Sequence, residues 1–128
     1  TRLWEFEDSS GTFNSLVKTS DTIQYTEWDK GTLTSSTLFT QAHGAGAIPK
    51  TFNAFLECTT ANGAYAVGDR IKQGGKQDSS ATGGTTVYAD ATNIYLAVGS
   101  GVTAINVDAS STLSLTLSSW KVILAMLD

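Results

Sequence analysis

Apolar and polar residues alternate most regularly between residues 51 and 59. Alternation with a period of two is typical of a strand that has one buried face and one exposed face. The expected buried face carries Phe52, Ala54, Leu56 and Cys58. Phe55 interrupts the pattern on the opposite face, where Asn53 and Glu57 are polar. We therefore expect Phe55 either to cover a second apolar layer or to face a neighbouring subunit.

A hairpin signal follows this strand at Asn62 and Gly63. Both residue types tolerate the positive φ that a tight hairpin turn requires, so an Asn-Gly pair between apolar stretches predicts a turn. Residues 65–71 are expected to form the returning strand. Gly68 and Asp69 lie within that strand and predict a kink or a bulge.

Further strands are predicted at short intervals along the chain. They cover residues 3–6, 12–17, 21–28, 32–41, 85–89, 93–98, 102–107 and 112–116. In the third of these, Ile23 and Tyr25 are expected on the apolar face. Turns are predicted between the strands, notably at residues 29–31 and 90–92, because Gly, Asp, Asn and Ser are frequent there.

Two longer connections are also predicted. Residues 42–49 form a small-residue loop that ends at Pro49, the only proline of the chain, which stops strand pairing. Residues 72–84 have no apolar side chain larger than that of Ala81, so we expect an exposed loop there.

The last stretch, residues 120–127, is apolar on both faces. A strand of this kind is buried twice. It is either the central strand between two layers, or it has the core on one side and another subunit on the other. The predicted subunit-interface residues are Phe55, Ile123, Ala125 and Leu127.

Composition supports an all-β fold. The chain has 128 residues, enough for one domain with a proper core, and only 16% of them are charged. Thr, Ser and Gly are plentiful, which favours short strands and turns over amphipathic helices. We predict an antiparallel β-sandwich over residues 32–128, with residues 1–31 forming N-terminal strands or a further segment packed on it.

Charge and cysteine content exclude several classes of protein. The net charge of −4 and the scattered basic residues argue against binding to a nucleic-acid backbone. Cys58 is the only cysteine, so no intrachain disulfide forms, and we expect a buried structural thiol. No run of about 18 apolar residues is present, so we expect no membrane insertion. The chain begins at Thr1 rather than Met, and we expect it to be a fragment of a longer protein.

Several stretches, taken together, resemble the C-terminal receptor-binding domains of bacteriophage tail fibres. They are residues 42–49 leading into 52–58, residues 63–71, residues 87–95 and the closing Trp120. The His-Gly pair that precedes Pro49 and an apolar strand is also loosely similar to H-type lectins, which are trimeric sugar-binding sandwiches. Residues before Thr32 lie outside the resemblance.

The resemblance implies a homotrimeric β-sandwich at the far end of a virion fibre. Its implied partners are a bacterial surface polysaccharide, such as lipopolysaccharide or capsule, and the rest of the fibre or tail. The implied location is the phage virion, after assembly in the cytoplasm of the host bacterium. A chain poor in cysteine is compatible with assembly in that reducing compartment.

Candidates for catalysis are weak. Glycan hydrolysis needs two carboxylates at a fixed separation, and the possible pairs are Glu5 with Glu7, Glu27 with Asp29, and Asp69 with Asp90. No motif supports any of them. No Gly-x-Ser-x-Gly elbow is present, so a nucleophile lacks its usual setting. We predict no enzymatic activity and no cofactor.

His43 is the only histidine. As a structural residue it would pack or form hydrogen bonds at a strand end. As a functional residue, three copies around a trimer axis could bind a metal or an anion, although one histidine per chain cannot form a zinc site alone.

Sugar recognition combines an aromatic face with nearby polar or charged groups. Two turn-adjacent groups offer this combination. The predicted ligand-binding residues are Trp28 with Asp29, and Tyr65 with Asp69 and Arg70. Each aromatic could instead serve the core or a subunit contact.

We therefore predict a non-catalytic tail-fibre domain that binds a host-surface glycan during adsorption. Two alternatives remain open: a purely structural virion fibre or decoration protein, and a glycan depolymerase.

Overall fold

The computed structural model describes residues 5–7, 13–15, 24–73, 82–105, 107, 109 and 111–127. This part of the chain is built from strands in antiparallel sheets, so the predicted all-β class is confirmed. One 3₁₀ turn, η2 (Leu117–Ser119), precedes the last strand. Among the described residues, no helix is long and apolar enough to cross a membrane.

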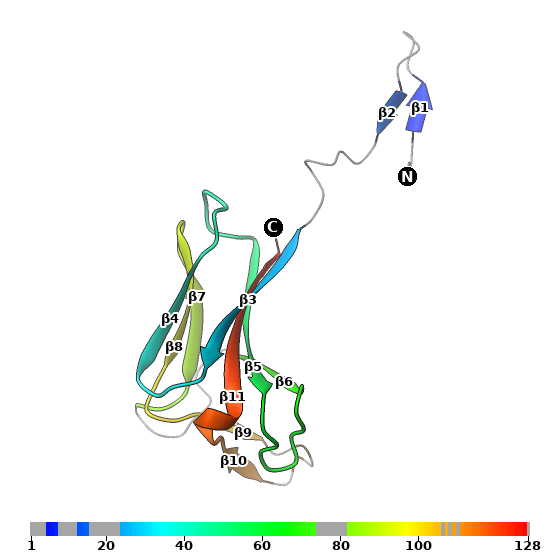
Figure 1. Cartoon of the computed structure of the whole chain (residues 1–128). Coiled ribbons are helices and arrows are strands. Elements are labelled where there is room, and N and C mark those ends of the chain that lie inside the picture. Colours follow the sequence, from blue (N-terminus) through cyan, green and yellow to red (C-terminus); the bar gives the residue numbers. More distant parts are fainter. Residues whose placement is uncertain are drawn as a thin grey trace.

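Two sheets form the body of the domain (Figure 1). The four-stranded sheet has the order β3-β11-β5-β6 and the three-stranded sheet the order β4-β8-β7. The strands of the first are β3 (Tyr25–Thr32), β11 (Trp120–Leu127), β5 (Thr51–Cys58) and β6 (Arg70–Gln73). Those of the second are β4 (Thr37–Ala42), β8 (Asn93–Val98) and β7 (Thr85–Ala89). The arrangement is consistent with a β-sandwich.

Two small hairpins complete the described strands. β1 (Glu5–Glu7) pairs with β2 (Phe13–Ser15), and β9 (Thr103–Ile105) pairs with β10 (Thr112–Ser114). Short strands were predicted at all four places. The predicted boundary between residues 31 and 32 runs through β3, so the part of the predicted N-terminal segment from Tyr25 onward is a strand of the larger sheet.

One apolar core lies between the two sheets. Leu56 and Leu124 from the larger sheet and Ile94 and Leu96 from the smaller one are all fully buried in it. Alternation produces this arrangement, because every second side chain of β5 and β8 points to the same side. The buried thiol of Cys58 is confirmed, with 1% of the residue exposed.

Polar pairs link the two sheets at their edges. On one side, the Lys30 ammonium donates to the Gln41 side-chain oxygen at 2.9 Å and joins β3 to β4. On the other side, the buried Thr85 hydroxyl donates to the Gln73 side-chain oxygen at 2.6 Å and joins β7 to β6. Buried polar groups need partners, and the buried Thr85 and Gln73 find each other across the two sheets, whereas Lys30 and Gln41 are partly exposed.

The turn predicted at residues 29–31 is wrong. β3 continues through it, and the pairing with β11 shifts register between Lys121 and Ile123. Gly31 has φ +84°, and its N–H bonds the Asp29 carboxylate at 2.9 Å. An extra residue next to a glycine in this conformation is a β-bulge, which uses the same residue types as a turn. The prediction for Tyr25 also fails, because its side chain faces outward and is 54% exposed.

The hairpin after β5 is longer than predicted. Gly63 has φ +60°, and Asn62 pairs with Tyr65, so the tight turn is present. The returning strand β6, however, starts only at Arg70. A second turn at Gly68, with φ +95°, brings the chain back, and the Gly68 N–H bonds the Cys58 carbonyl at 2.8 Å. The chain is redirected at Gly68 as predicted, but by a turn that precedes the strand and not by a kink or bulge within it.

Asn62 ties this turn to the last strand. Its side-chain oxygen accepts from the Trp120 indole N–H at 3.0 Å and from the Thr116 backbone N–H at 2.9 Å. Tyr65 packs edge-on against Trp120, with 5.4 Å between the ring centroids. The turn is therefore anchored to the only tryptophan whose side chain is fully buried in the described part of the chain.

Other predictions hold with little change. Residues 85–89 and 93–98 form the predicted hairpin, and residues 120–127 form a strand with the predicted bounds. The loop predicted over residues 42–49 is present but runs from residue 43 to residue 50, because Ala42 still belongs to β4, and Pro49 is buried in it.

The exposed loop predicted over residues 72–84 is wrong at its described ends, because residues 72 and 73 belong to β6 and both Gln73 and Gly84 are buried. Residues 74–81 lie outside the described part of the chain.

Candidate functional sites on the two outer faces

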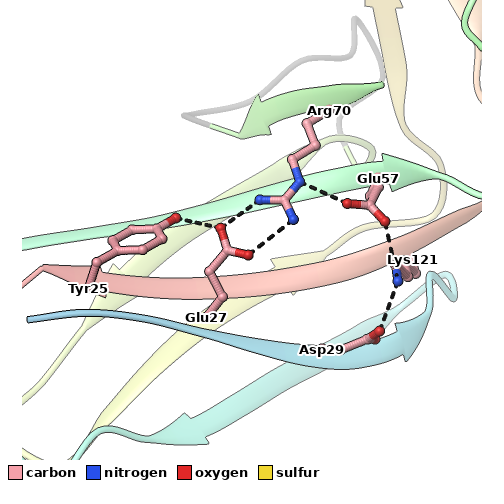
Figure 2. Close-up of polar contacts among 6 residues, drawn as sticks. All are labelled: Tyr25, Glu27, Asp29, Glu57, Arg70 and Lys121. Atoms are coloured by element: carbon pink, nitrogen blue, oxygen red, sulfur yellow. Dashed lines mark hydrogen bonds and ion pairs between the residues drawn. The ribbon is translucent and has the colours of Figure 1, made fainter. Parts of the chain in front are cut away.

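The outer face of the four-stranded sheet carries a row of ionised side chains (Figure 2). Arg70 forms two hydrogen bonds with the Glu27 carboxylate, at 2.6 and 3.0 Å, and a third with Glu57 at 2.8 Å. Lys121 contacts Asp29 at 3.0 Å and Glu57 at 3.2 Å. The Tyr25 hydroxyl donates to Glu27 at 2.6 Å. We call these six residues the charged row.

The charged row crosses the whole sheet. Arg70 lies on β6 and Glu27 on β3, which are the two edge strands, so the guanidinium group passes over β5 and β11. On the way it lies 5.5 Å from the centroid of the Phe55 ring. A cation over an aromatic face is attractive, and the aliphatic stem of arginine covers apolar surface.

Ion pairing holds the carboxylates of the row in their charged form. The hydrogen bonds from Arg70 lower the pKa of Glu27, and the Tyr25 hydroxyl adds to this effect. The hydrogen bond from Arg70 is the main cause of the lowered pKa of Glu57; burial opposes it, and Lys121 adds to the lowering. The Gly31 N–H and then Lys121 lower the pKa of Asp29. A general acid needs a raised pKa, so this environment disfavours that role for all three.

The second apolar face of β11 is covered from within the chain. Ile123 pairs with Asp29 and Phe55, and Ala125 pairs with Glu27 and Asn53. Both residues lie under the charged row, with 4% and 0% of their surface exposed. β11 is thus the central strand, with the core on one side and a layer of charged side chains on the other. Their burial does not require a second subunit.

The remaining predicted interface residues are more accessible. Phe55 is half-buried beneath Arg70, and Leu127 is 37% exposed at the end of β11. The interface itself stays a prediction, since the structure contains a single chain.

The predicted ligand-binding residues fall in three places. Asp29 and Arg70 both belong to the charged row, where Glu57 and Lys121 connect them. Trp28 points to the opposite side of β3 and packs against the core. Tyr65 packs on Trp120, and its hydroxyl donates to the Ile105 carbonyl at 2.6 Å. Asp69 accepts from the Ala66 N–H at 2.8 Å within the turn.

His43 is buried and has both ring nitrogens engaged. Nδ1 accepts from the Ala45 N–H at 3.0 Å, so Nε2 carries the proton and donates to the Asp90 carbonyl at 2.9 Å. This favours the structural interpretation of His43 over the metal or anion site. Within the described part of the chain, no group of three or more His, Cys, Asp or Glu side chains is placed to hold a metal ion.

The predicted carboxylate pairs do not form a catalytic arrangement. The side chains of Glu5 and Glu7 lie outside what the structure describes. Glu27 forms an ion pair with Arg70, and Asp29 forms one with Lys121. Asp69 lies in the β5–β6 connection and Asp90 in the β7–β8 turn, at opposite ends of the sandwich in Figure 1.

A pair of tyrosines on the other outer face was missed by the sequence reasoning. Tyr88 on β7 and Tyr95 on β8 are directly paired across the strands. Their rings stack with a centroid distance of 4.6 Å and an angle of 17° between planes. Tyr88 is 42% exposed. The signal was present, because the alternation of Val87 and Ala89 on β7 already places Tyr88 on the outer face.

A shallow hollow of about 250 Å³ lies where β7 begins and β8 ends, away from the β7–β8 turn. It is lined by backbone and by small side chains, among them Thr82, Thr86 and Ala97. None of its lining residues is ionisable, so it offers no group for acid–base chemistry.

Comparison with family models, with curated proteins and with solved structures finds no match to this chain.

Proposed function

We propose that this chain is a non-catalytic domain of a bacteriophage tail fibre that binds a glycan on the host surface during adsorption. The proposal includes a homotrimer and a place at the outer end of the virion fibre. The basis of the proposal is the resemblance to the C-terminal domains of tail fibres, from which the function is inferred.

One observation carries the proposal: the segments that bear the resemblance contact one another in the fold. His43, from the first segment, bonds the Asp90 carbonyl through its ring and the Thr92 carbonyl through its backbone N–H, and both partners lie in the third segment. Tyr65, from the second segment, packs on Trp120. Segments that are far apart in sequence thus contact each other at two places in the sandwich. These contacts support treating the segments as one motif.

The state of the carboxylates supports a binding role over hydrolysis. Glu27, Asp29 and Glu57 each have a lowered pKa from partners on their own sheet. Retaining and inverting glycosidases both need one carboxyl group that stays protonated near neutral pH. Release of reducing ends from purified polysaccharide would favour the depolymerase instead.

The proposed trimer has a specific constraint. Because the charged row already covers Ile123 and Ala125, a trimer that uses this face contacts the charged row, Phe55 and Leu127. The mass of the chain in solution tests the trimer directly. A monomer at micromolar concentration would argue against it.

Binding to cells tests the function. Fluorescently labelled chain is added to a panel of bacterial strains, before and after the cells are treated with periodate, which oxidises vicinal diols of sugars. We expect binding to some strains and its loss after periodate. Binding that resists periodate but is lost after protease treatment points to a protein receptor. Binding to no strain favours the structural virion protein.

A further inference from the structure

The outer face of the three-stranded sheet carries no charge on its strands. β4, β8 and β7 are described over their whole lengths, and none of their residues is ionised at neutral pH. The outward-facing side chains are Leu38, Thr40 and Ala42 on β4, Asn93, Tyr95 and Ala97 on β8, and Thr86 and Tyr88 on β7. The face therefore combines aromatic rings with neutral hydrogen-bonding groups.

Tyr95 is held in place by its hydroxyl group. The hydroxyl donates to the Asp90 carboxylate at 2.8 Å and accepts from the Asn93 amide at 3.1 Å. Asp90 is itself fixed, because it accepts from the backbone N–H groups of Thr92 and Asn93 at 2.8 and 2.7 Å. The ring of Tyr95 thus has a defined position before any ligand arrives.

The ring of Tyr88 is held in position because it stacks on the fixed ring of Tyr95. One side of its ring contacts Tyr95, and β7 is an edge strand, so no further strand of the sheet covers the other side. An aromatic side chain that is already fixed loses little conformational entropy on binding. Thr86 lies two residues earlier on the same face and adds a hydroxyl that can donate or accept.

We propose that the outer side of Tyr88 is a binding subsite for one uncharged pyranose ring of a glycan. The apolar face of the sugar stacks on the tyrosine ring, and its hydroxyl groups meet the Thr86 hydroxyl on β7 and the polar groups of the Asp90 turn. The carboxylate of Asp90 and the lack of lysine or arginine on the three strands disfavour uronic or sialic acids. This inference rests on the proposed function and names the ligand class for it.

The test compares two substitutions of similar volume at one position. Tyr88→Leu removes the ring, whereas Tyr88→Phe keeps it and loses only the hydroxyl. Tyr25→Ala is the matched control, since Tyr25 is an exposed tyrosine on the opposite face. The purified proteins are applied to immobilised oligosaccharides in three sets: neutral hexoses, N-acetylhexosamines, and sugars with uronic or sialic acid.

We expect the unchanged chain to bind one of the two uncharged sets. Tyr88→Leu should weaken this binding about tenfold, which corresponds to about 1.4 kcal/mol, because the stacking contact with the ring is lost. Tyr88→Phe and Tyr25→Ala should each stay within about threefold. The circular dichroism and Tm of each variant show whether it is folded. If Tyr88→Leu is unfolded, Tyr88→Phe still tests the inference, because loss of binding in a folded variant that keeps the ring would contradict stacking on that ring.

Failure of this inference differs from failure of the proposed function. If the unchanged chain binds glycans but Tyr88→Leu binds equally well, the subsite is wrong and the function stands. Binding confined to the acidic set also overturns the subsite. If the unchanged chain binds no glycan and no cells, the proposed function fails and takes the subsite with it. Capture by a protein receptor through Tyr88 would overturn the ligand class.

Discussion

The two outer faces of the domain solve the same physical problem differently. Each sheet has one side in the core and must present the other to its surroundings. The four-stranded sheet places Ile123 and Ala125 on its outer side and covers them with Arg70, Lys121 and three carboxylates. The three-stranded sheet has no ionised side chain on its strands and leaves Tyr88 and Leu38 about half exposed.

The difference separates a closed surface from an open one. On the larger sheet, charges pair with each other, so their hydrogen-bonding capacity is largely used within the chain. On the smaller sheet, the polar contacts fix a ring but leave one of its sides accessible. A ligand gains more from an accessible, ordered ring than from ions that must first give up their partners.

The largest expected effect tests whether the charged face is truly closed. Ile123→Ala should lower the free energy of unfolding by about 3 kcal/mol, because the side chain is 4% exposed despite pointing away from the core. Leu38→Ala on the other face should change it by less than about 0.5 kcal/mol, since that side chain is 51% exposed. Urea denaturation measures both. Equal changes in the free energy of unfolding for the two variants would contradict the claim that only the outer face of the four-stranded sheet is covered.

A smaller effect is expected when the arginine that spans the sheet is replaced. Arg70→Met keeps part of the stem over Phe55 but removes the bonds to Glu27 and Glu57. Exposed ion pairs contribute little, so we expect a loss of no more than about 1 kcal/mol. Arg70→Lys should lose nearly as much, because an ammonium cannot bond two carboxylates in the same fork geometry. An unchanged Tm in low salt for Arg70→Met would contradict a stabilising role.

Acid should weaken the charged face selectively. Glu27, Glu57 and Asp29 have a lower pKa in the folded chain than in the unfolded chain. Their contribution is therefore complete above the unfolded pKa, which is about 4 for these groups, and is lost as the pH falls from there through the lower folded pKa. Arg70→Met should show a shallower loss of stability over this range. Parallel pH profiles for both proteins would show that the row is not the source.

The smallest effect on stability is expected at the tyrosine pair. Tyr95→Phe removes the bonds to Asp90 and Asn93 but keeps the ring stacked on Tyr88. We expect a smaller drop in Tm than for Arg70→Met, together with weaker glycan binding, because Tyr88 would be less well ordered. A large drop in Tm with unchanged binding would mean that the hydroxyl serves the fold alone.

Local patterning predicts much of this architecture. Alternation defines β5 and its buried face, and β7, β8 and β11 have the predicted bounds. The errors come from residues that are compatible with two different local structures. Asp29 and Gly31 fit a turn as well as a bulge, and only the partner strand β11 decides between them. Likewise, the returning strand after Asn62 starts late because Tyr65 packs on Trp120, which is distant in sequence.

The candidate sites were predicted less well, for a related reason. The charged row joins β3, β5, β6 and β11, and sequence alone does not order these strands. Arg70 and Asp29 were nominated for a ligand, yet Arg70 pairs with Glu57 and Asp29 with Lys121, each on a neighbouring strand. The tyrosine pair was within reach, because a three-residue turn between two alternating strands aligns Tyr88 with Tyr95.

The Asn62–Gly63 turn also bears on chemical ageing. An asparagine before glycine is prone to lose its amide nitrogen when the Gly N attacks the side-chain carbonyl. Conversion to aspartate keeps an oxygen that can accept from Trp120 and Thr116, so the turn tolerates that product. Conversion to isoaspartate inserts an extra backbone carbon and displaces that oxygen. The indole N–H of Trp120 would then lose its partner, and stored protein would slowly lose stability from this end of the sandwich.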